Sequence, residues 1–311
     1  GMKSAARGGF TTICPMPNTK PVTDCAEVVS YVVNRAKELD IVNVLPVGAI
    51  TTGQSGTELA DIEEMKKAGI CALSEDGKSV MATDLYMKAM QLAKEADLPI
   101  FAHCEDRSLV RGGVMNAGKK AKEFGYAGIT DAVEDVIVAR DILMAKEAGC
   151  IVSFDPNLRP PLWKSLDEAK VEIEYGLSKC DILKISDNEV EFLFGTTDYD
   201  EGARLIREKY QIPLVLITLG KDGSRAYYKD LRVEVPGFVQ EHTIETTGAG
   251  DTFCANSLNY ILEHGMEELT EENLKELLTF ANAAASLITT RKGALRVMPT
   301  REEIKNFIQN V

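Results

Sequence analysis

The feature of this sequence that most restricts its fold is the alternation of short β-branched or apolar runs with longer segments of helical periodicity. Such alternation is typical of parallel strands joined by crossover helices. We therefore predict an α/β fold with a largely parallel sheet and flanking helices. In the first half we expect strands at residues 11–16, 42–47, 70–73 and 99–103, and helices at 26–39, 59–68, 82–96 and 132–148.

The second half continues this alternation and then changes to a β-rich stretch and a helical end. We expect strands at 151–154, 182–185 and 214–218, β structure at 224–235, and helices at 250–264, 271–290 and 301–309. Neither a repeat nor a low-complexity tract nor an evident linker separates the two halves. The secondary structure is therefore expected to run continuously from one half into the other.

Composition and charge exclude several classes of protein. The 311 residues are 45% hydrophobic, so the chain can bury a core. Its apolar runs are far shorter than the roughly 20 residues of a membrane-spanning helix. The net charge of −13 argues against a nucleic-acid partner. A small anionic ligand remains compatible with this charge, because local N–H groups can bind phosphate.

The cysteines and the opening residues bear on the compartment. Seven cysteines are scattered without a C-x-x-C pair, so neither a disulfide framework nor a zinc knuckle is expected. Residues 1–4 carry no apolar signal core. We expect a cytoplasmic protein with free thiols and no membrane partner, and we leave homo-oligomer formation open.

A glycine-rich turn before a late helix is the strongest candidate for a phosphate site. Residues 245–253 read E-T-T-G-A-G-D-T-F. Small residues let the N–H groups at a helix N-terminus approach an anion, and the helix dipole favours negative charge there. Asp251 makes sense in this place if it takes a proton from an attacking hydroxyl group. The alternative interpretation is a glycine turn with an aspartate cap.

Two segments upstream strengthen the first interpretation. The sequence T-L-G-K-D-G, from Thr218 to Gly223, ends a predicted strand with a glycine turn, as a loop beside a nucleotide would. Asn188 and Glu191 are three residues apart, a spacing that places both on one helix face where they could orient magnesium-bound water. Taken alone, that pair would be interpreted as a solvated helix face.

From about Cys150 to Val311 the chain resembles the PfkB (ribokinase-like) sugar kinases, and most of all bacterial fructokinases. The resemblance rests on five ordered motifs: D-P-N-L-R from Asp155, N-x-x-E at Asn188 and Glu191, T-L-G-x-x-G from Thr218, T-T-G-A-G-D-T-F from Thr246, and F-A-N-A-A-A from Phe280 with R-K-G-A from Arg291.

The resemblance implies roles for these residues. Asp251 would be the catalytic base, and Gly248, Ala249 and Gly250 would form the anion hole. ATP and Mg²⁺ would be the cofactors, with Asn188 and Glu191 at the magnesium-phosphate end. Thr218, Gly220, Gly223, Asn282 and Gly293 would lie along the nucleotide, and Asp155, Asn157 and Arg159 would bind substrate. Glu245 departs from the family, which usually has Asp there.

Residues 3–141 resemble a different family, the dihydroorotases of the amidohydrolase superfamily. The matching segments are A-A-R-G-G-F-T-T from Ala5, M-P-N-T-K-P from Met16, S-E-D-G-K from Ser74 and A-H-C-E-D from Ala102. The resemblance implies that Asp76 and His103 are zinc ligands and that Asn18 holds the substrate carboxylate. The family's H-x-H pair and later ligands have no counterpart here, so Asp76 and His103 are expected to be vestigial.

The two resemblances meet at the segment A-K-E-A-G, residues 145–149, which both families share before a strand. We therefore expect a chimera of a partial barrel segment, 1–149, and a ribokinase-like ATP-binding and catalytic segment, 150–311. The expected function is ATP-dependent phosphoryl transfer to a sugar hydroxyl, as in a fructokinase, impaired by the missing sugar-binding and lid half. Two alternatives stay open: nucleotide binding without catalysis, and zinc-dependent cyclic amide hydrolysis.

Overall fold

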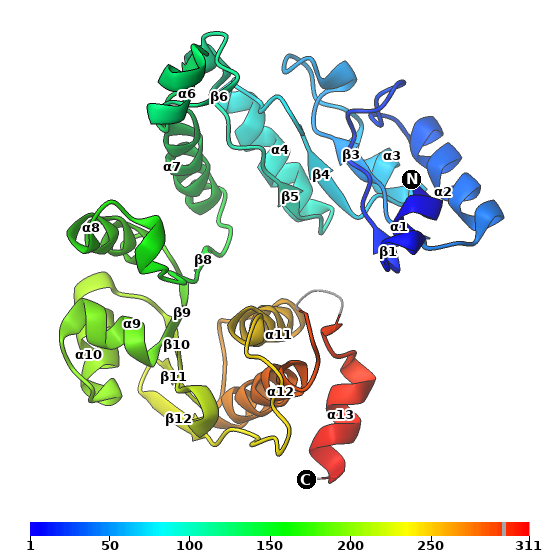
Figure 1. Ribbon diagram of the computed structural model, residues 1–311. Coiled ribbons are helices and arrows are strands. Elements are labelled where there is room, and N and C mark those ends of the chain that lie inside the picture. The colour runs from blue at the N-terminus through cyan, green and yellow to red at the C-terminus, as the bar shows by residue number, and fades with distance from the viewer. Residues whose placement is uncertain (294–296, 311) are drawn as a thin grey trace. The chain divides into compact units, whose positions relative to one another are not determined.

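The computed structural model describes residues 1–293 and 297–310, and it divides the chain into two compact units, Gly1–Cys150 and Ile151–Val311. Each unit has its own sheets and its own helices (Figure 1). The predicted α/β class with mostly parallel strands is confirmed.

The N-terminal unit is built on a parallel sheet of three short strands in the order β3-β4-β5. Its strands are β1 (Thr12–Ile13), β2 (Asn43–Val44), β3 (Val47–Ala49), β4 (Ala72–Ser74), β5 (Ile100–Phe101), β6 (Met115–Asn116) and β7 (Gly128–Ile129). Its helices are α1 (Met2–Arg7), α2 (Ala26–Leu39), η1 (Thr52–Gln54), α3 (Ile62–Ala68), α4 (Thr83–Glu95), α5 (Arg107–Val110), α6 (Lys119–Phe124) and α7 (Ala132–Glu147).

Several strands of this unit are shorter than the sequence predicts, and prolines explain two of the differences. Pro15 and Pro17 have no N–H to donate to a neighbouring strand, so β1 ends at Ile13. Pro46 divides the expected strand 42–47 into β2 and β3. The core of the unit lies between β3, β4 and the helices α2, α3 and α4, where Met65, Leu73 and Ala89 are fully buried.

The C-terminal unit has one five-stranded sheet in the order β12-β11-β10-β9-β8. The strands are β8 (Ser153–Phe154), β9 (Ile182–Ser186), β10 (Leu214–Thr218), β11 (Ser224–Tyr228) and β12 (Leu231–Val235). The first three are parallel and the last two form an antiparallel hairpin. The helices are η2 (Pro160–Leu162), α8 (Leu166–Leu177), α9 (Asp187–Phe194), α10 (Tyr199–Tyr210), η3 (Gly220–Asp222), α11 (Ala249–His264), α12 (Glu271–Thr289) and α13 (Arg301–Asn310).

Helices cover both faces of this sheet, with α8, α9 and α10 on one side and α11 and α12 on the other (Figure 1). Strand alternation sorts the side chains between the two faces. Leu183 and Ile185 pack against α8, α9 and α10, whereas Ile182 and Leu216 pack against α11 and α12. Position 184 therefore points to the α11 side.

Two helices of this unit, α8 and α10, were not expected, although their first turns carry clear signals. Ser165 caps α8 by accepting from the N–H of Glu168 at 3.1 Å. Asp198 caps α10 by accepting from the N–H groups of Asp200 and Glu201. These caps satisfy backbone donors that a helix start leaves unpaired.

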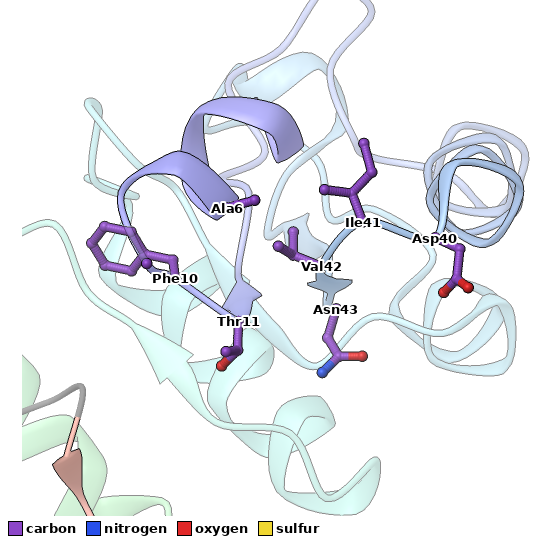
Figure 2. A pocket seen from close by; sticks show the side chains of 8 residues that line it. Ala6, Phe10, Thr11, Asp40, Ile41, Val42 and Asn43 are labelled. Carbon is purple, nitrogen blue, oxygen red and sulfur yellow. The ribbon is translucent and has the colours of Figure 1, made fainter.

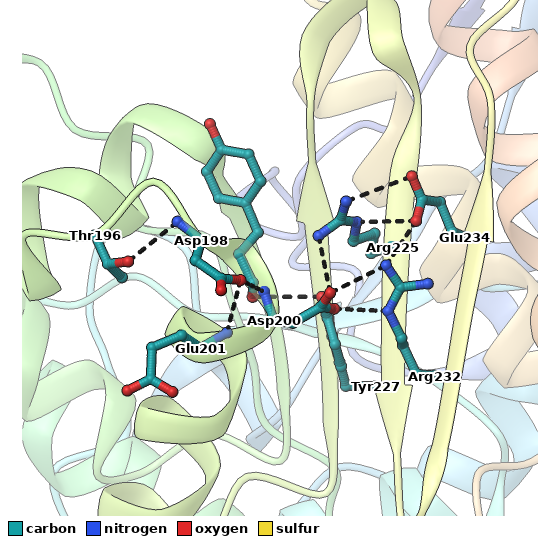
Figure 3. Close-up of polar contacts among 9 residues, drawn as sticks. Thr196, Asp198, Asp200, Glu201, Arg225, Tyr227, Arg232 and Glu234 are labelled. Carbon is teal, nitrogen blue, oxygen red and sulfur yellow. Dashed lines mark hydrogen bonds and ion pairs between the residues drawn. The ribbon is translucent and has the colours of Figure 1, made fainter.

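A network of charges joins α10 to the β11–β12 hairpin (Figure 3). The Asp200 carboxylate accepts from Arg232 Nε at 2.6 Å and from the Tyr227 hydroxyl at 2.7 Å. Glu234 accepts from Arg232 at 2.7 Å and pairs with Arg225 at 3.3 Å. The bond from Arg232 is the main cause of a lowered pKa at Asp200.

Candidate functional site

A cavity of about 800 Å³ lies in the C-terminal unit at the carboxyl ends of β9 and β10. Its wall includes the loop after β10, the chain after β12, the first turn of α11 and the second half of α12. In open α/β sheets, ligands bind outside the carboxyl ends of the strands. The predicted site residues that line this cavity are Asn157, Arg159, Asn188, Thr218, Gly220, Gly223, Ala249, Gly250 and Asn282.

The loop after β10 has the shape that its glycines allow. Gly223 has φ 109°, and a Cβ at this position would lie 2.1 Å from the carbonyl oxygen of Val235. A side chain therefore cannot be placed there without moving β12. Gly223 keeps the loop against the sheet, and Thr218 and Gly220 reach the cavity beside it.

The first turn of α11 brings backbone N–H groups to the cavity. Gly248 precedes the helix with φ 79°, a left-handed conformation that glycine adopts without strain. Ala249 and Gly250 then line the cavity. The N–H groups of Gly250 and Asp251 have no hydrogen-bond acceptor among the described residues. A helix N-terminus with free donors of this kind is suited to an anion.

Asp251 lies in the same turn, with an exposed side chain that is not part of the cavity wall. It is nevertheless close to other charged groups of the site. Burial raises the pKa of the Cys254 thiol to about 11, and the charges of Asp155 and Asp251 add to that rise while Lys184 opposes it. The turn thus brings the carboxylates, the thiol and an ammonium group into one neighbourhood.

At the start of α9 the cavity meets Asn188 and Glu189, whereas Glu191 is exposed outside it. The buried Glu189 carboxylate accepts from the N–H of Leu158 at 2.6 Å and from the N–H of Ser186 at 2.8 Å. It therefore fixes the loop after β8 and caps its own helix. The expected partnership of Asn188 with Glu191 is not seen at the cavity.

The D-P-N-L-R segment after β8 contributes some residues to the cavity wall and others to contacts behind it. Asn157 and Arg159 line the cavity, and Arg159 Nη1 donates to the carbonyl of Leu158 at 3.1 Å. Asp155 is not in the wall, and its carboxylate is paired with the ammonium of Lys184, which is in the wall. Burial raises the pKa of Asp155, and the Lys184 charge works against that rise.

The last predicted residues come from α12 and the chain after it. Asn282 is buried against the cavity, where it accepts from the Ser224 hydroxyl at 2.9 Å and donates to the carbonyl of Val235 at 3.1 Å. Gly293 lies outside the wall, and its N–H donates to the Glu245 carboxylate at 2.5 Å. Ala294, the last residue of the R-K-G-A motif, lies outside the described residues.

Sequence reasoning missed Lys184. This residue is only 5% exposed, lines the cavity, and has its Nζ 3.2 Å from Asp155 Oδ1. Its Nζ is also 3.2 Å from the position that a Cβ on Gly250 would take. The signal available in the sequence was a lysine inside the apolar run I-L-K-I of a predicted strand. Lysine is rarely buried unless it is paired.

In the N-terminal unit the predicted ligands follow adjacent strands. Asp76 and His103 each come two residues after the ends of β4 and β5, which pair in parallel with Ser74 opposite Phe101. Asp76 accepts from Asn18 Nδ2 at 2.5 Å, and His103 Nε2 lies 3.6 Å from Glu105. Among the described residues, no group of three or more His, Cys, Asp or Glu side chains is placed to hold a metal.

The N-terminal unit also has a hollow of about 380 Å³ between α1, β1 and β2. Figure 2 shows the side chains around it, including Ala6, Phe10, Ile41 and Val42. Asp40 is the one charged residue among those that line it. This hollow therefore lacks the convergence of polar groups found in the C-terminal cavity. Across residues 1–293 and 297–310, no helix has the length and apolar character of a membrane span.

Comparison with known families finds two families, in the order in which the two resemblances follow one another along the sequence. Residues 1–154 match the family described as dihydro-orotase-like, and residues 117–301 match the family described as pfkB family carbohydrate kinase. Both resemblances found in the sequence are thereby confirmed, and the interpretation as a chimera fits them.

Individual proteins are similar to this chain in its dihydroorotase-like part. A dihydroorotase of Solibacter usitatus is 51% identical over 149 residues, 48% of this chain and 35% of that protein. A Staphylococcus epidermidis dihydroorotase is 48% identical over 150 residues. The chain thus spans about a third of the length of these relatives.

Solved structures extend the comparison. Aminoimidazole riboside kinase from Salmonella enterica, complexed with aminoimidazole riboside and an ATP analogue, is similar with a TM-score of 0.51 and 26% identity, over 57% of this chain and 59% of that one. Fructokinase from Vibrio cholerae O395, in a form with fructose, ADP and calcium, has a TM-score of 0.53 at 20% identity over 96% of each chain, which shows the fold alone.

Proposed function

This chain belongs to the pfkB family of carbohydrate kinases, and on that premise we propose that its C-terminal unit transfers the terminal phosphoryl group of ATP to a sugar hydroxyl. The observation that carries this proposal is the cavity at the carboxyl ends of β9 and β10, whose wall includes Gly250 of the first turn of α11 with its unpaired N–H. A polyphosphate can place its negative end at such a helix start.

The residues around the cavity suggest how a nucleotide would lie. The loop after β10 lines the cavity with Thr218, Gly220 and Gly223, together with Lys221, and the nucleotide body would lie against it. Gly250 offers an unpaired backbone donor in the wall for the transferred phosphoryl group, whereas the N–H of Ala249 already donates to the carbonyl of Thr246 at 3.2 Å. Charge that develops on that group in the transition state would be stabilised by donors already held in place.

Asp251 is the proposed general base. Its carboxylate would take the proton of the attacking sugar hydroxyl as the new O–P bond forms and the bond to the β-phosphate breaks, with the electron pair leaving on ADP. Asp251 directly follows Gly250, which lines the cavity, so an acceptor at the rim can reach the base and the phosphoryl group together.

Magnesium fits this site on the chemistry of its donors. Mg²⁺ is usually held by one or two protein carboxylates together with substrate phosphates and water, and not by a cage of protein groups. Asp187 and Asn188 line the cavity and would supply the oxygen ligands. When bound, the ion would neutralise part of the phosphate charge. Glu191, exposed beyond the wall, would act only through intervening water.

A second function, nucleotide binding without catalysis, is favoured by one observation. The side chain of Asp251 is exposed and lies outside the cavity wall, so water has access to this carboxylate. In this case the nucleotide would bind as proposed, and no sugar would change its fate.

One pair of measurements separates these functions. ATP is titrated into the chain by calorimetry in the presence of Mg²⁺, with and without fructose, and ADP release is followed in a coupled assay. Sugar kinase activity predicts binding together with ADP release that rises with fructose or another sugar. Binding without sugar-dependent ADP release supports the second function, and the absence of nucleotide binding contradicts both.

A further inference from the structure

The buried lysine of β9 stands out from its surroundings on the sheet. Lys184 pairs in register with Leu216 of β10, and Ile182 and Leu216 on this face pack in the apolar core beneath α11 and α12. The Lys184 side chain is only 6% exposed. Burying an ammonium group costs free energy unless charged or polar neighbours compensate for the lost water. We therefore expect such neighbours around Lys184.

Asp155 supplies only part of that compensation. Both carboxylate oxygens lie 3.2 Å from Lys184 Nζ. An ammonium group has three hydrogens to donate, and the structure records no acceptor for Lys184 other than Asp155 among the described residues. Asp155 thus holds the ammonium in position while leaving donor capacity unused.

The unused donors lie beside the free N–H groups of α11. Lys184 Nζ is 3.2 Å from the position of an added Cβ on Gly250, and both residues line the same cavity. A cation from β9 and backbone donors from α11 therefore meet at one end of this cavity. A phosphoryl oxygen there would accept charge-assisted hydrogen bonds from both.

We infer that Lys184 is a catalytic residue whose ammonium group contacts the terminal phosphoryl group of the nucleotide, and that Asp155 is the residue that positions it. This inference rests on the proposed function. Lys184 takes no part in proton transfer in this assignment, because the proton of the acceptor goes to Asp251. The assignment also gives Asp155 a role in support of the lysine, in place of the contact with substrate that its motif implies.

The test compares nucleotides that differ by one phosphate group. ADP and the non-hydrolysable β,γ-imido analogue of ATP are titrated by calorimetry, with Mg²⁺, into the wild-type chain and into Lys184→Met. The inference predicts that the wild type binds the triphosphate more tightly than ADP, and that Lys184→Met lowers triphosphate affinity by about tenfold or more while changing ADP affinity little.

Two further variants keep the result interpretable. Lys184→Met combined with Asp155→Asn removes both charges, so no buried carboxylate is left alone, and it should show the same selective loss even if the single variant folds poorly. Lys209→Met removes an exposed lysine from α10 and should keep the wild-type preference.

Equal weakening of both nucleotides, or an unchanged preference for the triphosphate in the folded double variant, would overturn the inference and leave Lys184 as a structural partner of Asp155. These outcomes differ from failure of the proposed function, in which the wild-type chain binds neither nucleotide and Lys184 has no phosphate to contact.

Discussion

The two units differ in the arrangement of polar and charged groups at the carboxyl ends of their strands. In the C-terminal unit, the ends of β9 and β10 open on a cavity lined by Gly250, whose N–H is unpaired among the described residues, and by Lys184, whose ammonium lies beside Gly250. In the N-terminal unit, polar residues also follow adjacent strands, but Asp76 is bonded to Asn18 and His103 is beside Glu105.

This difference agrees with what the two kinds of predicted site require. Phosphate can be bound by a glycine turn, a helix start and one cation, which here come from neighbouring elements of one unit. A catalytic zinc ion needs about three protein ligands gathered from several strands. The residues proposed to bind phosphate therefore lie within one unit, whereas among the described residues no three side chains are gathered that could hold a metal.

The largest expected effect concerns Asp251. If the C-terminal unit carries out phosphoryl transfer, Asp251→Asn should lower sugar-dependent ADP production by roughly 100-fold or more, because no base then accepts the proton of the sugar hydroxyl. Nucleotide affinity measured by calorimetry should change little. Glu263→Gln, which removes one charge from the other end of α11, is the matched control. Equal turnover in wild type and Asp251→Asn would remove Asp251 from the mechanism.

A substitution at Gly223 tests whether the glycine loop shapes the cavity. Gly223→Ala should lower the free energy of unfolding of the C-terminal unit by about 2 kcal/mol or more, because φ is 109° and the added Cβ would meet the carbonyl of Val235. Denaturant titration followed by circular dichroism measures the change.

Gly118 in the N-terminal unit provides the comparison for this change. A Cβ there would meet nothing within 4 Å, so Gly118→Ala should cost about 1 kcal/mol or less, chiefly because alanine replaces the glycine N-cap of α6. A Gly223 variant as stable as the Gly118 variant would show that the loop tolerates a side chain.

The charge network of Asp200 predicts a smaller, pH-dependent effect. Arg232 lowers the pKa of Asp200 in the folded chain, so its contribution to stability is fully present above the unfolded pKa of about 3.9 and is lost as pH falls through the folded pKa. The Asp200 side chain is 48% exposed, which limits the contribution to roughly 0.5–1 kcal/mol.

Asp200→Asn should therefore destabilise the C-terminal unit near neutral pH, and the difference from wild type should shrink as the pH falls below about 4. Unfolding curves at a series of pH values would show this trend. Asp230→Asn, in the turn between β11 and β12, should show no such dependence of stability on pH. A constant difference at every pH would mean that the charge of Asp200 does not stabilise the network.

The smallest expected effect lies in the N-terminal unit. Zinc titration followed by metal analysis should give clearly less than one ion per chain, because Asp76 and His103 are not joined by a third ligand among the described residues. Asp76→Ala and His103→Ala should therefore leave the metal content unchanged. One zinc ion per chain, together with hydrolysis of dihydroorotate, would restore the hydrolase alternative.

The sequence predicted several elements of the C-terminal unit closely, although it did not predict α8 and α10 in spite of the local caps at their starts. The boundaries of β10 match the prediction, and α11 and α12 differ by a residue at one end. The strands of the N-terminal unit are shorter than predicted. The length of a strand depends on its pairing with neighbouring strands, which the spacing of apolar residues does not show. Proline also broke the pattern at Pro15 and Pro46.

The site was predictable in part for the same reason. Glycine turns such as those at Gly220 and Gly223 can be recognised in the sequence, and both residues reach the cavity. The place of Lys184 in the site cannot be recognised in this way. It depends on contact with Asp155, 29 residues earlier in the chain, and on the start of a helix much later in the chain. The position of Glu189 at the wall, next to the predicted Asn188, was likewise decided by its capping of α9.

The most direct test of the account is hydrogen–deuterium exchange of the whole chain with and without MgATP. If the C-terminal unit forms the phosphate site by itself, nucleotide should slow exchange in peptides that cover the first turn of α11 and the loop from Thr218 to Gly223. Peptides around Asp76 and His103 should be unaffected. Protection confined to the N-terminal unit, or no protection at the start of α11, would contradict the account.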